Sequence, residues 1–457
     1  MNARIFREYD IRGVADRDLS DELALNLGKA IGTMLSRQGK TDVTVGRDVR
    51  VSSPRLHKAL TTGLLSTGMK ILDIGVVATP VLYFGALHLA TGGGVMITGS
   101  HNPPEDNGFK IVVGKGTIFG EEIQVLRRMI EAKDFVTGQG SSEPREILRA
   151  YVDACKARIQ LGPRRCKVVV DAGNGCGGIF GPTLYRELGF DVVELYCEPD
   201  GRFPNHHPDP TVEANVAELK AKVAETGAEL GIAFDGDADR IGVVDARGRV
   251  VWGDQLMILL GRAILAEVPG ATFVSEVKCS QALYDELEKA GGRAIMWKVG
   301  HSLIKTKMKE VGAQLAGEMS GHIFFAHRYF GFDDAIYSGA RLLELLSKET
   351  RTASELVDTL PVMINTPEIR ADMPDDIKFA VVKRVTERLK AHKETKDVVD
   401  IDGVRANFGD GWGLVRASNT QPALVLRFEA KTKERLTALR ALVEGELAAA
   451  RKDVEGK

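Results

Sequence analysis

Apolar and polar positions along the chain follow one pattern that occurs three times. Each copy has a β-branched apolar run, a loop, an amphipathic stretch with helical spacing that stops at a glycine, and a second apolar run. A strand, a helix and a second strand explain this order, and such units normally form right-handed crossovers between parallel strands. The first and second runs of the copies are 42–48 and 69–74, 167–171 and 190–195, and 272–277 and 293–298. We therefore expect three related α/β domains with mixed sheets.

Each copy is followed by another apolar run that leads directly into a polar cluster. The three clusters are 98–103, 235–240 and 317–322. Binding groups are commonly placed on loops at strand ends, because the strands fix the loops rigidly while the loops stay accessible. Three different polar loops at equivalent strand ends indicate one cleft that is shared between the domains.

Breaks in composition divide the chain into four parts. Residues 137–144 are rich in Gly, Ser and Gln, residues 246–249 form a polar glycine turn, and residues 361–376 contain three prolines. Such stretches favour turns and loops over regular elements. The expected domains are 1–145, 146–249, 250–361 and 362–457.

The last part differs in pattern from the three repeats. It predicts short strands at 398–401, 414–416 and 424–429, followed by a helix over 433–451. Strands that follow one another before a single long helix are typical of an α+β arrangement rather than a further strand–helix–strand unit. We expect a smaller C-terminal α+β domain.

Composition and charge exclude several classes of protein. The 457 residues fit three or four domains at about 150 residues each. With 61 Lys and Arg against 63 Asp and Glu, no global field attracts nucleic acid or an anionic membrane. No apolar run approaches the ~20 residues of a spanning helix, and residues 1–13 are charged where a signal peptide is apolar. The five cysteines include no Cys-x-x-Cys pair. We expect a cytosolic protein with reduced thiols.

Three carboxylates follow a buried apolar run at alternate positions, Asp235, Asp237 and Asp239. Hard divalent cations prefer such oxygen ligands. An EF-hand is excluded, because its sixth and twelfth positions would be Arg240 and Ala246 instead of Gly and Glu. A solvated acidic turn is the alternative, but it would place three like charges beside a buried strand without a counterion. The cluster predicts a Mg²⁺ site.

Ser100 lies in the first polar cluster. It does not fit the Gly-x-Ser-x-Gly elbow of hydrolases, since Thr98 and Asn102 replace the outer glycines, so acyl transfer is not favoured. A lone serine is commonly a turn residue. The following Pro-Pro pair and Lys110 on the outgoing strand instead indicate a fixed loop with a cation nearby.

A glycine motif at 173–178 superficially matches the Gly-x-Gly-x-x-Gly fingerprint of dinucleotide-binding proteins. A lone match is weak support for a cofactor site. The neighbouring Gly177 and Pro182 favour a tight turn between a strand and a helix. We therefore expect no dinucleotide to bind there.

A motif that suits phosphate binding lies between two expected strands of the last domain. It combines guanidinium, hydroxyl, amide and backbone N–H donors, which suit a phosphate, although Ser-Asn-Thr is also ordinary turn composition. The side chains are Arg416, Ser418, Asn419 and Thr420, with Arg427 on the following strand.

Taken in order, these motifs resemble the α-D-phosphohexomutase superfamily, and most closely its bacterial phosphomannomutase/phosphoglucomutase branch. The matching stretches are 6–13, 98–110, 235–240, 317–322 and 416–429. The resemblance implies four domains, three related α/β units and a smaller fourth. In chain order they would carry a phosphoserine loop, a metal-binding loop, a sugar-binding loop and a phosphate-binding loop.

The resemblance also implies roles for individual residues. The serine that matches Ser100 carries the phosphoryl group, and Mg²⁺ is held beside it. The implied catalytic residues are Ser100, Lys110, His101, Arg240 and Arg12. The implied metal ligands are Ser100, Asp235, Asp237 and Asp239. The implied substrate-binding residues are Tyr9, Lys278, His301, Glu318, Ser320, His322, Arg416, Ser418, Asn419, Thr420 and Arg427.

The implied reaction is reversible phosphoryl transfer between the 1- and 6-positions of mannose and glucose phosphates through phosphoserine and a 1,6-bisphosphate. The bisphosphate would also act as an activator, and the chain is expected to work as a monomer. Lys110 is the first candidate for proton exchange, if its amine has a lowered pKa, and His101 is the second.

Two alternatives to this activity are open. A phosphoglucosamine mutase typically has Gly-Glu-Gln-Ser-Gly-His in its sugar loop, and Met319 replaces the Gln here, which favours neutral hexoses. A non-catalytic sugar-phosphate sensor would have no need for a phosphorylatable serine beside a metal site.

Overall fold

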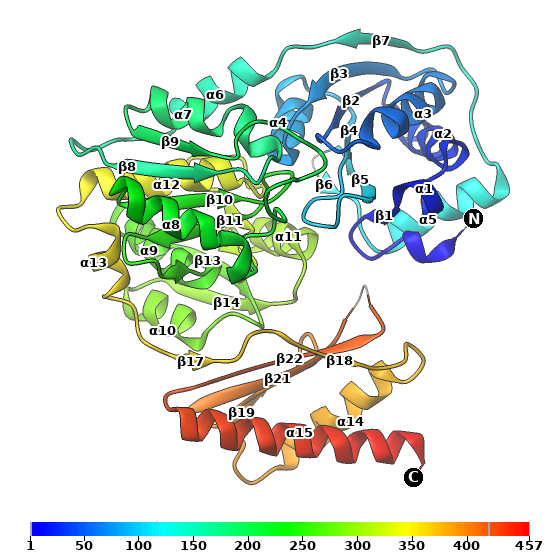
Figure 1. Cartoon of the computed structure of the whole chain (residues 1–457). Helices are drawn as coiled ribbons and strands as arrows, with labels where there is room; N and C mark the ends of the chain where they lie inside the picture. The colour runs from blue at the N-terminus through cyan, green and yellow to red at the C-terminus, as the bar shows by residue number, and fades with distance from the viewer. Residues whose placement is uncertain (1, 115, 419–420, 457) are drawn as a thin grey trace.

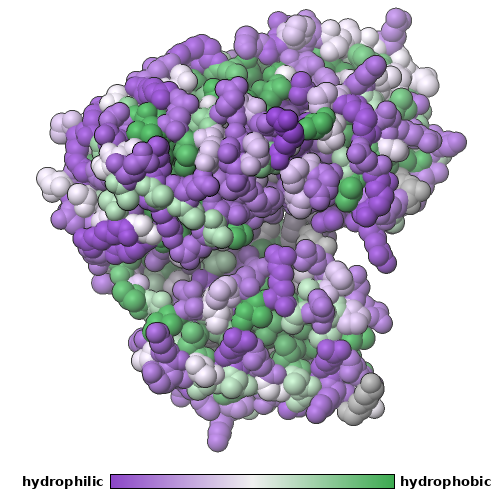
Figure 2. All heavy atoms as spheres, in the orientation of Figure 1, coloured by the Kyte–Doolittle hydropathy of each residue, from purple (hydrophilic) through white to green (hydrophobic). Residues whose placement is uncertain are grey.

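The computed structural model describes residues 2–114, 116–418 and 421–456. Three sheets with covering helices make up one side of the molecule, and a fourth sheet with two helices lies apart from them (Figure 1). Figure 2 shows the outline hollowed at one edge, between the N-terminal domain above and the C-terminal domain below. None of the helices in the described ranges combines the length and apolar character that crossing a bilayer requires.

The first domain is built on a seven-stranded mixed sheet of order β1-β5-β4-β2-β3-β7, with β6 beside β5. Its strands are β1 (Ile11–Val14), β2 (Asp42–Arg47), β3 (Lys70–Val76), β4 (Gly93–Ile97), β5 (Asp106–Val113), β6 (Gly116–Thr117) and β7 (Ser141–Pro144). Its helices are α1 (Ala15–Asp18), α2 (Asp21–Arg37), α3 (Ser53–Leu65), α4 (Thr79–His88) and α5 (Glu121–Ala132). The glycine-rich stretch at 137–144 is more than a linker, because β7 pairs in parallel with β3 at the sheet edge.

The second domain has a five-stranded sheet of order β12-β11-β10-β8-β9. Its strands are β8 (Lys167–Asp171), β9 (Asp191–Leu195), β10 (Leu230–Phe234), β11 (Ile241–Asp245) and β12 (Val250–Val251). Its helices are α6 (Leu148–Lys156), α7 (Gly181–Glu187) and α8 (Ala217–Thr226).

The third domain has a four-stranded sheet of order β14-β13-β15-β16. Its strands are β13 (Thr272–Glu276), β14 (Arg293–Trp297), β15 (Leu315–Gly317) and β16 (Ile323–Phe325). Its helices are α9 (Gly253–Glu267), α10 (Gln281–Lys289), α11 (His301–Val311), α12 (Ala335–Lys348) and α13 (Ala353–Val357).

The same four-strand order lies at the centre of these three sheets. The orders β3-β2-β4-β5, β9-β8-β10-β11 and β14-β13-β15-β16 each join three parallel strands to one antiparallel strand. The turn between the last two strands of each set carries one of the three polar clusters. The expectation of three related α/β domains is confirmed, and it explains why three functional loops lie at equivalent places.

The fourth domain is an antiparallel sheet of order β17-β22-β21-β20-β19, with β18 also beside β22. Its strands are β17 (Ile364–Asn365), β18 (Ile369–Asp372), β19 (Asp397–Val399), β20 (Val404–Asn407), β21 (Gly411–Ala417) and β22 (Ala423–Ala430). Helices α14 (Lys378–Ala391) and α15 (Lys433–Glu455) pack against each other and against this sheet. The sequence pattern missed β17, β18, β20 and α14, because short edge strands and a charged helix leave little periodicity. The smaller C-terminal α+β domain itself is confirmed.

The apolar cores show how these domains are joined. The largest core combines residues from all three α/β domains, among them Val81, Phe234 and Ile336. The fourth domain has a core of its own between its sheet and its two helices. A small third cluster of Val277, Trp412 and Leu414 joins it to the third domain. One shared core therefore joins the first three domains, while the apolar contact between the fourth domain and the third is small.

Candidate active site

Ser100 lies in the turn between the buried strand β4 and strand β5. Its backbone has φ of 50°, in the left-handed region that residues other than glycine rarely adopt. Its side chain is buried, with Oγ donating to Asp235 Oδ2 at 2.8 Å and lying 3.1 Å from His101 Nδ1. The amide of Ser100 donates to Thr98 Oγ1 at 2.8 Å. The hydroxyl group is thereby fixed across the junction with the second domain.

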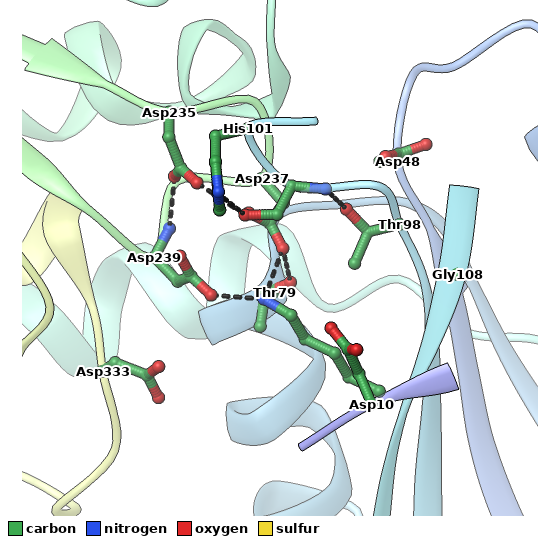
Figure 3. Close-up of polar contacts among 12 residues, drawn as sticks. Asp10, Asp48, Thr79, Thr98, His101, Gly108, Asp235, Asp237, Asp239 and Asp333 are labelled. Atoms are coloured by element: carbon green, nitrogen blue, oxygen red, sulfur yellow. Dashed lines mark hydrogen bonds and ion pairs between the residues drawn. The ribbon is translucent and has the colours of Figure 1, made fainter. Parts of the chain in front are cut away.

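The three aspartates lie in the turn between β10 and β11. All three are 0% exposed, and their carboxylate oxygens lie within 4.8 Å of one another. Asp235 Oδ1 accepts the amides of Asp239 and Arg240 at 3.1 Å each, which holds the turn closed. Figure 3 shows the three carboxylates converging beside His101 and Thr79.

Lys110 on β5 points into this carboxylate cluster. Its Nζ lies 2.8 Å from Asp237 Oδ2 and also pairs with Asp239. Burial alone would lower the pKa of Lys110, but Asp237 and Asp239 outweigh it and hold that pKa well above its ordinary value. Lys110 thus lies as an ammonium group between two carboxylates, and its part in proton exchange stays a prediction.

The aspartate cluster fits a divalent cation. Burial, followed by the charges of Asp239 and Asp237, raises the pKa of Asp235 well above its usual range, because Arg240 and Lys110 compensate the three carboxylates only in part. Asp237 Oδ1 and Asp239 Oδ1 are buried and have no hydrogen-bond partner among the described residues. Oxygen ligands without partners in one small volume are the donor set that a hard cation requires.

Residues of the third polar cluster, 317–322, lie beside the aspartate loop. Arg240 and His322 form an isolated β-bridge between the second and third domains, and Arg240 Nε donates to His322 Nε2 at 3.0 Å. Because Nε2 accepts this bond, the ring proton of His322 is assigned to Nδ1, which lies 3.2 Å from Asp333 Oδ2. Glu318 Oε1 accepts the amide of Gly300 at 2.8 Å, and Ser320 Oγ donates to Glu318.

Residues of the first domain approach the same region. The hydroxyl of Tyr9 donates to the carbonyl oxygen of Val299 at 2.8 Å, and its ring lies 6.0 Å from that of His301. The imidazoles of His301 and His322 are stacked with their centroids 5.7 Å apart. Burial and the nearby Lys305 hold the pKa of His301 well below its usual range. The side chains expected on the sugar side are thus together.

Arg12 lies at the serine loop. Its guanidinium donates to Asn102 Oδ1 and to Asp10 Oδ2 at 2.6 Å each. A cation held beside the turn that carries Ser100 is suited to a phosphate.

The fourth domain supplies the last group. Arg416 Nε donates to Asp402 Oδ2 at 3.1 Å, and Ser418 Oγ accepts the amide of Gln421. Arg427 Nη1 donates to the carbonyl oxygen of Lys278 at 2.5 Å. Lys278 Nζ, in the third domain, pairs with Glu368 at 3.2 Å. Asn419 and Thr420 lie outside the described residues.

Sequence reasoning missed several buried charged residues around these groups. Those nearest to the residues described above are Asp48, Arg50, Asp333 and Arg405, all of them buried. The sequence does contain a signal for Asp48, because a carboxylate lies at or directly after the end of the first strand of every repeat, at Asp48, Asp171 and Glu276. Each of these side chains accepts the amide two residues further along. The glycine motif at 173–178 follows one of them and forms the expected tight turn, in which a Cβ on Gly175 would lie 2.7 Å from Gly236 O.

Family models match four segments that together span most of the chain. Their descriptions are Phosphoglucomutase/phosphomannomutase alpha/beta/alpha domain I at 3–137, domain II at 149–248 and domain III at 252–363, and the C-terminal domain at 368–446.

Individual relatives agree with these segments. A Pseudomonas aeruginosa "Phosphomannomutase/phosphoglucomutase" is 48% identical over 98% of this chain and 96% of its own length. A Neisseria gonorrhoeae "Phosphoglucomutase" is 46% identical over 94% of this chain and 93% of its own length. The crystal structure of a phosphoglucomutase/phosphomannomutase family protein from Burkholderia thailandensis superposes with a TM-score of 0.93, at 42% identity and over 98% of both chains.

Proposed function

Because the chain belongs to the bacterial phosphoglucomutase/phosphomannomutase family of the α-D-phosphohexomutase superfamily, we propose that Ser100 carries the phosphoryl group. The enzyme is an isomerase that transfers a phosphoryl group between the 1- and 6-positions of hexose phosphates. The observation that carries the proposal is the buried hydroxyl of Ser100, bonded at 2.8 Å to one of three clustered carboxylates.

The superfamily is metal-dependent, and we propose Mg²⁺ as the metal of this chain. Ser100, Asp235, Asp237 and Asp239 would hold it, and it would neutralise charge on the transferring phosphoryl group. Lys110 and Arg240 add positive charge from two further elements, and Arg12 lies at the serine loop. Phosphoryl transfer needs such charge stabilisation and an aligned acceptor more than covalent work by the protein.

We propose that the imidazoles of His101 and His322 exchange protons with the reacting hydroxyls, beside Lys110, whose part in this exchange stays a prediction. His101 Nδ1 lies 3.1 Å from Ser100 Oγ, and burial, then Arg240, holds its pKa well below the usual range. On the sugar side, His322 has its Nδ1 directed at Asp333, so that the Nε2 lone pair, which here accepts the bond from Arg240 Nε, is the one that would take a proton. Lys110 then acts as a charge partner of the aspartates.

The distal phosphate is assigned to the fourth domain. Arg416, Ser418 and Arg427, together with Asn419 and Thr420, would bind the phosphate that is not reacting. Tyr9, Lys278, His301, Glu318, Ser320 and His322 would line the sugar. A hexose 1,6-bisphosphate that turns end for end would be the intermediate and also the activator. Domain limits of 1–145, 146–249, 250–361 and 362–457 stay close to the ends of the family segments.

The substrates that we propose are glucose and mannose phosphates. Met319 in the sugar loop and the names of the related proteins support neutral hexoses. A cytoplasmic location and a monomeric state stay predictions.

A coupled assay with glucose, mannose and glucosamine 1-phosphates, Mg²⁺ and glucose 1,6-bisphosphate tests the proposal. We expect conversion of the first two sugars and loss of activity in EDTA that Mg²⁺ restores. If glucosamine 1-phosphate reacted tenfold faster than either, a difference of about 1.4 kcal/mol in transition-state binding, the chain would be a phosphoglucosamine mutase instead. Binding of all three without turnover would support a sensor.

A further inference from the structure

Arg50 lies in the loop after β2, and its side chain is 0% exposed. Nη2 donates to the carbonyl oxygens of Ser100 at 2.7 Å and of Asn102 at 2.6 Å. Nη1 donates to the carbonyl oxygens of Asp106 at 2.9 Å and of Pro103. One buried guanidinium thus binds four carbonyl oxygens, three in the turn between β4 and β5 that carries Ser100 and one at Asp106, the first residue of β5.

Asp48 fixes the other side of this turn. Its Oδ2 lies 3.2 Å from Arg50 Nε and accepts the amide of Gly99 at 3.1 Å. A Cβ on Gly99 would lie 2.5 Å from Arg50 Cζ, so the turn can rest on the guanidinium only because this residue is glycine. The pair of Asp48 and Arg50 therefore binds both amide and carbonyl groups of the serine loop.

The second domain closes over the same arginine. The ring of Phe203 lies 5.1 Å from Arg50 Cζ, and Gly201 packs against the backbone at Val49 and Arg50. A Cβ on Gly236, in the metal loop, would lie 2.5 Å from Ser100 O. The serine loop is thus enclosed between the guanidinium and the metal loop, and it has no room to relax.

This enclosure accounts for the unusual backbone of Ser100. A serine with φ of 50° is disfavoured, and such a conformation persists only where the surroundings over-determine it. Four donated hydrogen bonds from one rigid, permanently charged fork supply that constraint. The same bonds direct the carbonyl oxygens of the turn to Arg50.

We propose that Arg50 is a positioning residue that holds Ser100 in this conformation, so that Oγ faces Asp235 in both the free and the phosphorylated enzyme. The proposal rests on the proposed role of Ser100 as phosphoryl carrier. Arg50 touches neither the sugar-loop side chains nor those of the fourth domain in any contact described above. Its loss should therefore slow transfer at Ser100 without weakening recognition of the sugar phosphate.

The test is Arg50→Lys, because an ammonium group cannot present the planar fork that reaches four carbonyls. We expect kcat to fall about a hundredfold, while KM for glucose 1-phosphate changes less than threefold. Intact-mass spectrometry should show phosphorylation of Ser100 by glucose 1,6-bisphosphate slowed by a similar factor. Arg55→Lys is the matched control, since Arg55 also donates to backbone carbonyls of the first domain, at Ala15 and Leu19, but not to the serine loop.

A second variant tests the same inference if Arg50→Lys does not fold. Gly99→Ala keeps the charge but pushes the turn off the guanidinium, and Gly99 has no positive φ that alanine would strain. It should reproduce the fall in kcat at nearly constant KM. A kcat within threefold of wild type in whichever variant folds, with Ser100→Ala inactive, would overturn the inference alone. A fully active Ser100→Ala would instead remove the proposed function.

Discussion

The serine loop meets the second domain at one junction, and the Lys278 loop of the third domain meets the fourth domain at another. Arginines hold both loops, but these arginines come from different places. In both, arginines bind the backbone carbonyls of a loop that carries a functional side chain. The serine loop is held by Arg50 of its own domain. The Lys278 loop is held by the fourth domain, where Arg405 Nη1 donates to the carbonyls of Val277 and Cys279 at 2.7 Å each.

The difference lies in what each loop depends on. The serine loop is complete within the fused core of the first three domains. The Lys278 loop is held by Glu276 of its own domain and, in addition, by the fourth domain through Arg405, Arg427 and a bond from the amide of Gln281 to Glu429. We infer that the phosphoryl carrier is permanently arranged, whereas the distal grip on the substrate is conditional on domain position.

The largest effect is expected at the permanent junction, in Ser100→Ala. Without the carrier hydroxyl, turnover should fall to background, while the protein keeps its fold and binds glucose 1-phosphate. The coupled assay and a thermal melt measure both properties, and peptide mass spectrometry should find no phosphate at the serine loop. Ser66→Ala, at the end of α3, is a control that should keep full activity. Near wild-type turnover by Ser100→Ala would show that Ser100 does not carry the phosphoryl group.

A smaller effect is expected from Arg416→Ala in the fourth domain. Loss of a charged phosphate contact costs roughly 1.5 to 3 kcal/mol, so kcat/KM should fall by tens- to hundredfold. Phosphorylated Ser100 should still be detected by mass spectrometry, because the carrier is arranged without this domain. An Arg416→Ala enzyme that could no longer be phosphorylated would show that the two junctions are not separate.

Arg405→Lys addresses the conditional junction alone. Arg405 is buried and stacks on Trp412 with Cζ 3.8 Å from the ring centroid, and it donates to two backbone carbonyls of the Lys278 loop and to Gln281 Oε1. We expect KM for glucose 1-phosphate to rise about tenfold, equivalent to about 1.4 kcal/mol, with a lesser fall in kcat. Steady-state measurement of kcat and KM for Arg405→Lys and Arg50→Lys, side by side, tests the comparison. The same kinetic pattern in both variants would contradict a division between transfer and grip.

The smallest signal is expected in solution scattering. The fourth domain has its own core and a limited contact with the third, so substrate that bridges Arg416 and Ser100 should draw it inward. The radius of gyration should decrease slightly at saturating glucose 1-phosphate. An unchanged value, together with a fully active Arg416→Ala, would show that the fourth domain does not clamp the substrate.

Much of this architecture was predictable because local pattern and chemistry coincide. Strand–helix–strand periodicity identified three domains, and polar clusters at strand ends identified the loops of Ser100, Asp235 and Glu318. The partners of Lys110 were not predictable, since they depend on how β5 of one domain meets a turn of another. Arg50 was missed for a similar reason. An isolated arginine after a strand gives no sign that four carbonyls surround it.

The carboxylates at the end of the first strand of each repeat bear on how the three domains could have evolved. Asp48, Asp171 and Glu276 each fasten the amide two residues ahead, so every repeat begins its loop in the same way. An ancestral unit with this self-fastened start could be duplicated and then altered further along the loop without losing its shape. Divergence of three copies from one parent would then account for Arg50 in the first, a glycine turn in the second and the buried Lys278 in the third.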